Sequence, residues 1–301
     1  MQIFDKSHPC NESGRPLMAT VGVENILDAQ AAYVEALGYE VVCDKPVSQE
    51  YARLWGDEKI AGCSSRVLRP QSETPVCIRL IETDVSDDAT PGPGWFALEL
   101  CVRDSAVLYE QLCSSDYFQP FAPPTELSFT DKIFPFQCRG SNGEILYLNE
   151  TRGNLPDIDL PIASSFVDHI FIVILSASDL EKSTDFYEAA LAARLQESHE
   201  IPYKTINRVF DLPLSTLHKL NTLGTGRNVF LELDQLPGIA AVQQSVAGVH
   251  KGINCVTFNA LPNHLLRSDF HSCSDAPYHG ANVAQLRGPD GERIEVIDFE
   301  K

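Results

Sequence analysis

The sequence predicts an α+β fold built from four βαβββ-like modules arranged in two pairs. Two observations predict it. A turn-and-strand segment occurs twice, as CRGSNGEILYL from Cys138 and as LRGPDGERIEV from Leu286, with the Arg, both Gly and the Glu in matching places. Each half of the chain also shows the same order of a strand, a helix and further strands. A turn sequence followed by alternating apolar residues is typical of a tight turn that enters a strand.

The second half of the chain shows this order most clearly. Residues 167–175 are β-branched and apolar, as expected of a buried strand. Residues 179–193 carry apolar side chains at close to helical spacing and follow Ser178, so they predict a helix with a serine N-cap. The remaining elements are predicted strands over 228–234 and 252–259 and a closing hairpin over 282–298.

The first half predicts the same succession of elements. These are strands over 19–24, 76–81, 97–102 and 144–149, with a helix over 28–37. Two further segment pairs align between the halves, GWFALEL with GINCVTF and AYVEALG with FYEAALA, at unequal offsets that indicate loops of different length. The polar, proline-containing stretch 151–165 is the predicted linker between a domain of residues 1–150 and a domain of residues 165–301.

The charge balance narrows the classes of partner. The 301 residues include 23 Lys and Arg against 42 Asp and Glu, which gives a net charge of −19. Nucleic-acid binding depends on basic side chains that neutralise phosphates, and anionic membrane surfaces attract basic segments for the same reason. We therefore expect a small-molecule substrate as the partner, with neither nucleic acid nor a membrane.

The cysteine pattern, the apolar runs and the N-terminal sequence indicate the cellular compartment. The nine cysteines are scattered and include no CxxC pair, which is typical of reduced thiols in a cytosolic protein. The longest apolar run, 166–177, is interrupted by Asp168 and His169 and is too short to span a bilayer. The N-terminus lacks the features of a signal peptide. We expect a cytoplasmic protein.

Five segments of the second half together carry a family resemblance. They are VDHIFIVI from Val167, DFYEAALAARL from Asp185, FLEL from Phe230, GINCVTF from Gly252 and LRGPDGERIEV from Leu286. In this order and spacing they resemble the glyoxalase/bleomycin-resistance/extradiol-dioxygenase superfamily, also called vicinal oxygen chelate proteins. The resemblance covers essentially the whole chain. It implies two glyoxalase-like domains, in which paired βαβββ modules form an open cup of strands around a metal ion.

The resemblance also implies a set of site residues, because the family's ligands come from the first and last strands of each module. The third module offers His169 and Glu232 at these positions. The fourth offers Cys255, where the family usually has His, and Glu295. These four residues are the implied ligands of a divalent metal, Fe²⁺, Mn²⁺, Ni²⁺ or Zn²⁺. A carboxylate beside such an ion can act as a general base, so Glu232 and Glu295 are the implied catalytic residues.

The matching positions of the first half carry different chemistry. They are occupied by Thr20, Arg79, Ala97 and Tyr147. None of these is an ordinary metal ligand, so the domain of residues 1–150 is expected to be metal-free. A separate group of His264, His271, His279 and Cys273 has spacing unlike a zinc site, and we expect it to form a polar loop with His279 near the mouth of the cup.

Three functions remain open at this point. The first is a metal-dependent isomerase or lyase acting on a small oxygenated molecule, favoured because family members of that type keep a ligand at the Glu232 position. The second is an Fe(II) extradiol-type dioxygenase, weakened because Cys255 replaces a His and Gln285 replaces a Tyr of that pattern. The third is a non-catalytic protein that binds or sequesters a small molecule. A homodimer is compatible with each.

Overall fold

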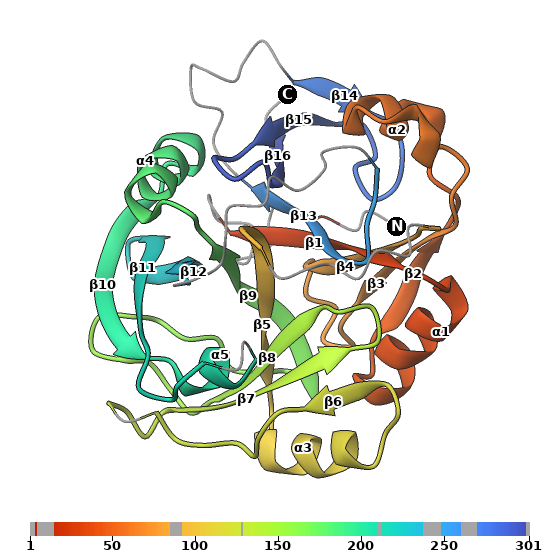
Figure 1. Ribbon diagram of the computed structural model, residues 1–301. Helices are drawn as coiled ribbons and strands as arrows, with labels where there is room; N and C mark the ends of the chain where they lie inside the picture. The colour runs from red at the N-terminus through yellow and green to blue at the C-terminus, as the bar shows by residue number, and fades with distance from the viewer. Residues whose placement is uncertain are drawn as a thin grey trace.

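The computed structural model describes residue 4 and residues 15–84, 92–127, 129–209, 212–236, 248–259 and 270–298. Within these residues the chain forms two curled eight-stranded sheets with few helices (Figure 1). The predicted α+β class is therefore confirmed. No helix among the described residues is both long and apolar enough to cross a bilayer.

The first sheet has the strand order β14-β15-β16-β13-β1-β4-β3-β2. Its strands are β1 (Pro16–Val23), β2 (Glu40–Asp44), β3 (Ser65–Arg69), β4 (Cys77–Glu82), β13 (Gly252–Asn259), β14 (His271–Cys273), β15 (Ala281–Arg287) and β16 (Arg293–Asp298). The first and fourth modules thus share one sheet. Their contact is the antiparallel pairing of β1 with β13, in which Thr20 lies opposite Cys255.

The second sheet has the strand order β10-β11-β12-β9-β5-β8-β7-β6. Its strands are β5 (Gly94–Val102), β6 (Phe118–Pro120), β7 (Ile133–Gly140), β8 (Ile145–Thr151), β9 (Val167–Ser176), β10 (Arg194–Pro202), β11 (Leu217–Thr225) and β12 (Asn228–Gln235). This sheet joins the second and third modules through the antiparallel pairing of β5 with β9.

Neither sheet is therefore built from one half of the chain alone, although we expected consecutive modules to share a cup. The repeat could not reveal this, because each module offers a similar first-strand edge and either pairing satisfies the same sequence pattern. The division of the chain into domains of residues 1–150 and 165–301 therefore remains a prediction. The two cups that the sheets form are each shared between those halves.

Helices complete each module. They are α1 (Ile26–Ala31), which continues into a π-helical turn η2 (Ala32–Ala36), α2 (Gln49–Trp55), the 3₁₀ turn η3 (Glu58–Ile60), α3 (Ser105–Cys113), α4 (Leu180–Leu191) and α5 (Lys204–Val209). Helix α4 confirms the predicted helix but has Asp179 as its N-cap rather than Ser178, because the Asp179 side chain accepts a hydrogen bond from the backbone N–H of Lys182. Helix α2 was not predicted, and it lies beside β14 and β15 of the fourth module (Figure 1).

The buried apolar side chains of the described residues form three cores. The largest contains residues of both sheets together with α1, α3 and α4, among them Val21, Leu98, Tyr187 and Val256. A second core fills the concave side of the first sheet and includes Trp55. A third, smaller core lies on the concave side of the second sheet. We call these two concave regions the first–fourth cup and the second–third cup.

Candidate functional site

The first–fourth cup contains a fully buried carboxylate with four hydrogen-bond donors. This is Glu295 of β16. Its Oε1 accepts from the Tyr51 hydroxyl at 2.6 Å and from Gln285 Nε2 at 2.6 Å. Its Oε2 accepts from the Thr257 hydroxyl at 2.7 Å and from the Tyr278 hydroxyl at 2.6 Å. Two donors on each oxygen use the acceptor sites that an ionised carboxylate offers.

Arg79 of β4 places a positive charge beside this carboxylate. Its guanidinium donates to the Tyr278 hydroxyl at 2.8 Å, and its Cζ lies 4.3 Å from the centre of the Tyr51 ring and 5.1 Å from that of Tyr278. The two rings are stacked, with centroids 5.7 Å apart. Burial alone would lower the pKa of Arg79, but Tyr278, Tyr51 and Glu295 outweigh it and raise that pKa. The guanidinium therefore stays charged.

The two tyrosines remain protonated donors. Burial raises the pKa of both Tyr51 and Tyr278 well above the ordinary value, although the charge of Arg79 acts in the opposite direction. Tyr51 lies in the first turn of α2, where its backbone N–H donates to the Oγ of the N-cap residue Ser48. A helix from the first module thus supplies a donor to a carboxylate of the fourth module.

A pocket of about 150 Å³ opens above Arg79 and Tyr51. Val47, Ser65 and Val67 are also buried lining residues, whereas Lys45 and His279 line the pocket at exposed positions. Among the described residues that line it, Asp275 is the one acidic residue. His279, expected near the mouth of a cup of the third and fourth modules, lies at an exposed position in the lining of this pocket of the first–fourth cup. His271 and Cys273 lie on β14 and are not among the described lining residues of this pocket, and His264 lies outside the described residues.

Cys255 belongs to the same cup but is not prepared to bind a metal. It is fully buried in the apolar cluster of this cup. Burial, with the nearby charge of Glu295, raises the pKa of the Cys255 thiol well above the ordinary value. Because the thiolate is the form that binds metals, a protonated thiol is a poor ligand.

The second–third cup contains a different group, three carboxyl side chains. Glu99, Glu232 and Asp234 all have raised pKa values, first because of burial, and the pKa of Glu232 rises to about 7. Asn149 donates to Glu99 at 2.6 Å, but the Asn149 Oδ1 has no hydrogen-bond partner, and neither do the two oxygens of Asp234 when Asp234 and Glu232 are both ionised. The Glu232 Oε1 and the hydroxyl of Thr222 are also unpartnered. A protonated Asp234 can donate a hydrogen bond to ionised Glu232. This hydrogen bond lowers the pKa of Glu232 and raises that of Asp234.

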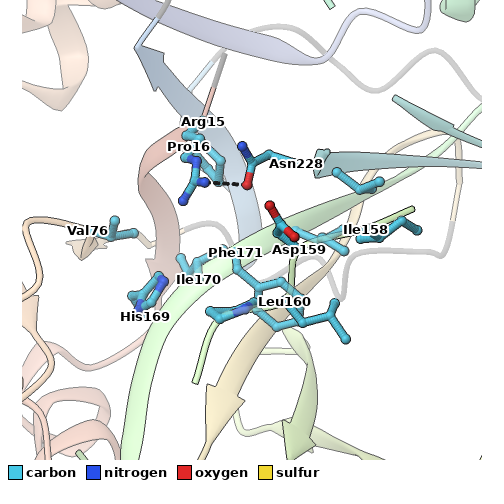
Figure 2. A pocket seen from close by; sticks show the side chains of 13 residues that line it. Arg15, Pro16, Val76, Ile158, Asp159, Leu160, His169, Ile170, Phe171 and Asn228 are labelled. Carbon is cyan, nitrogen blue, oxygen red and sulfur yellow. Dashed lines mark hydrogen bonds between the residues drawn. The ribbon is translucent and has the colours of Figure 1, made fainter. Parts of the chain in front are cut away.

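His169 lies away from both carboxylate groups. Its Nδ1 is 3.0 Å from an oxygen of Asp168, and it lines a separate pocket of about 150 Å³ together with Val76 and Ile170 (Figure 2). Glu232 pairs with Ile174, five residues further along β9, which corresponds to roughly 16 Å of strand. The structure therefore does not bring His169 and Glu232 together.

The four implied ligands are thus divided between the two sheets. Cys255 and Glu295 share the first–fourth cup, while Glu232 lies in the second–third cup and His169 beside the other pocket. In the described ranges, no three His, Cys, Asp or Glu side chains are grouped so that they could hold a metal ion. The arrangement does not favour the extradiol alternative, which needs two His and a Glu around one iron.

The hydrogen-bond partners of the oxygen atoms in each cup provide a separate test of whether the implied metal ion fits there. The first–fourth cup does not fit a cation, because Glu295 already has four donors and Arg79 adds a positive charge. The second–third cup fits better, since its unpartnered oxygens are of the type that Mn²⁺, Mg²⁺ and Ca²⁺ prefer. A cation there would have to displace the shared proton and draw the oxygens together.

Some residues of the first–fourth cup were not predicted as site residues. Tyr51 and Tyr278 received no role, and Arg79 was identified only as an unsuitable ligand. The segment SQEYARLW, a serine followed by a short helical pattern, could have indicated α2 and hence Tyr51. No local pattern could have indicated Tyr278, because it reaches Glu295 from a loop between β14 and β15.

Comparison with solved structures identifies the fold. The chain resembles glyoxalase I from Zea mays, with 17% sequence identity, a TM-score of 0.62 and coverage of 94% of this chain and 92% of that one. It also resembles a Bacillus subtilis protein described only provisionally as a dioxygenase, with 10% identity, a TM-score of 0.59 and coverage of 95% and 85%. The fold that the resemblance implied is thereby confirmed: the chain has the fold of glyoxalase I.

Sequence comparison adds nothing more specific. No family model matches the chain. No curated protein matches it at a significant level. At such low identity to the solved structures, the likeness establishes the fold, and the residues of the two cups must support any activity.

Proposed function

We propose that the chain binds a small oxygenated organic molecule in the first–fourth cup and holds it by direct contacts rather than through a metal. The observation that carries this proposal is the set of four donors on Glu295. They leave no free acceptor site on the one carboxylate at a ligand position of this cup. The neighbouring ligand position is occupied by Arg79, which favours recognition of an electron-rich group.

The groups facing the pocket favour binding over proton abstraction. Glu295 is not among the described residues that line the pocket, whereas Tyr51 and Arg79 are. Both tyrosines keep their protons, so they act as donors rather than bases. The fold neighbours include glyoxalase I, which supports a small molecule as the occupant.

Thermal unfolding in the presence of small carbonyl, hydroxyl and carboxyl compounds tests this proposal. We expect a raised Tm that is unchanged by EDTA. Ser274→Phe at the rim should abolish that shift, while Ser272→Phe, at an exposed serine outside the pocket lining, should preserve it. A shift that disappears on metal removal, or that survives Ser274→Phe, would contradict the proposal.

A second candidate is metal-dependent isomerase or lyase chemistry in the second–third cup. The unpartnered oxygens of Asp234, Glu232 and Asn149 favour it, because they form an oxygen-only donor set. A pKa of about 7 would also suit Glu232 as a general base at neutral pH. In this candidate Glu232 keeps its implied roles, and His169, Cys255 and Glu295 have none.

A further inference from the structure

Arg79 has hydrogen-bonding capacity that the described protein groups do not use. An arginine side chain carries five N–H donors in a planar fork. The one hydrogen bond that Arg79 makes within the described structure goes to the Tyr278 hydroxyl. Its side chain is nevertheless only 3% exposed. No Arg79 nitrogen is among the enclosed, unpartnered atoms of the described residues, so its remaining donors open toward the pocket that it lines.

No described acidic residue supplies that partner. Arg79 forms no ion pair with any described carboxylate, and Glu295 reaches it only through the Tyr278 hydroxyl. The stacked rings of Tyr51 and Tyr278 both pack against the guanidinium, with their centroids 4.3 and 5.1 Å from its Cζ. The fork is therefore held in position, and because Arg79 lines the pocket, its charge is available there.

The pocket has the size and charge for a small anion. Its volume of about 150 Å³ matches a cavity that accommodates benzene, so it suits about six non-hydrogen atoms. Lys45 adds a second positive charge at the exposed side, against the single carboxylate of Asp275. Positive groups at the mouth of a pocket attract anions as they approach it. This attraction opposes the repulsion of anions by a chain whose net charge is −19.

We propose that Arg79 binds the oxyanion of a small organic acid, with a carboxylate placed against its planar fork and Lys45 assisting at the mouth. The inference rests on the proposed function of this cup and names its ligand class. A carboxylate matches the fork with two parallel hydrogen bonds, as a phosphate also can. We assign a carboxylate because a small organic acid has the number of atoms that this pocket accommodates, and the titration of phosphate described below tests the alternative.

Isosteric pairs of ligands test the charge requirement on the unaltered protein. Lactate and lactamide, or pyruvate and pyruvamide, differ little except in charge and are titrated by calorimetry at two ionic strengths. We expect the acids to bind at least about tenfold more tightly than the amides, and to weaken as salt is added. Inorganic phosphate is titrated in parallel, and tighter binding of phosphate than of either acid would overturn the carboxylate assignment.

Three variants locate the binding. Arg79→Gln should lower lactate affinity by at least about tenfold, while Arg152→Gln, an arginine stacked on Phe134 of the other sheet, should leave it unchanged. Lys45→Gln, at an exposed position, should weaken binding about two- to fivefold and reduce its salt dependence. This variant provides the test if Arg79→Gln does not fold. Equal affinity for lactate and lactamide, abolished by Ser274→Phe, would overturn this inference and leave the proposed function intact. Absence of binding by any compound would contradict both.

Discussion

The Tyr187 hydroxyl donates a 2.7 Å hydrogen bond to Glu292, and the equivalent pair in the first half, Tyr33 and Glu144, is 3.4 Å apart. Each tyrosine lies on the helix of one module, and each glutamate lies in the turn of the next. The pairs therefore link modules three to four and one to two, whereas the sheets link one to four and two to three. Each module is thus connected to two others, which closes the four into a ring.

The difference in length between these two hydrogen bonds predicts unequal losses of stability. We expect Tyr187→Phe to lower the free energy of unfolding by about 1–3 kcal/mol, because Glu292 loses a close partner while buried. Tyr33→Phe should cost less, since its hydroxyl is farther from Glu144. Urea denaturation of both variants gives the comparison, and equal losses would show that the hydroxyls contribute only through packing.

The pH dependence of stability follows from the glutamates of the same pairs. Burial raises the pKa of Glu144 and Glu292 from 4.5 to about 7. Between these values the folded protein holds a proton that the unfolded chain has lost, so stability is greatest below pH 4.5 for these groups and falls through pH 7. The expected decrease is up to about 1.4 kcal/mol per pH unit for each group.

Replacing both glutamates by glutamine isolates this contribution. We expect the double variant Glu144→Gln, Glu292→Gln to show a flatter profile of unfolding free energy between pH 5 and pH 8. Glu200→Gln on the exposed strand β10 is the matched control and should retain the wild-type slope. A wild-type protein that gains stability from pH 5 to pH 8 through these groups would oppose the prediction.

The repeated turn explains why so much of the fold was predictable. A Cβ at Gly140 or Gly288 would collide with the side chain of Glu144 or Glu292, so the Gly and the Glu are required together. This local requirement is visible in the sequence, as are the apolar strands beside it. The pairing of modules was not predictable, because it depends on which strand edges meet after the chain has crossed between sheets.

The candidate site was less predictable than the fold for a related reason. Alignment of the repeats predicts Glu232 and Glu295 as residues that face a cup, since strand alternation is a local property. It could not show that Glu295 meets Tyr51 and Tyr278, which come from a short helix and a loop. It also placed His169 with Glu232, although a separation along the strand keeps them apart.

Glu295→Gln tests the charge balance of the first–fourth cup. An amide turns an N–H₂ group toward neighbours that are themselves donors, and it removes the negative charge nearest to Arg79. We expect a loss of about 3–5 kcal/mol in unfolding free energy at pH 6. Glu292→Gln is the matched control and should cost far less, because Glu292 is already largely protonated at that pH. Similar losses in the two variants would show that Glu295 does not balance the buried charge.

Asp234→Asn tests whether the second–third cup holds protons or a cation. Asp234 is fully buried, and its carboxyl pKa is raised by burial and then by the charges of Glu232 and Glu99. An amide can still donate to Glu232 and removes one source of repulsion. In EDTA at pH 8 we therefore expect the variant to be as stable as the wild type or up to about 1 kcal/mol more stable.

Added Mn²⁺ distinguishes the two occupants of that cup. If the unpartnered oxygens bind the ion, Mn²⁺ at about 100 times its Kd should stabilise the wild type by about 2.7 kcal/mol. The gain should be larger at pH 8 than at pH 6, because the ion must displace the shared proton. It should be lost in Asp234→Asn and retained in Asp185→Asn, at an exposed aspartate of α4. Stabilisation that persists in Asp234→Asn would place the ion elsewhere, and no stabilisation at either pH would identify the three carboxyl groups as a proton-sharing cluster alone.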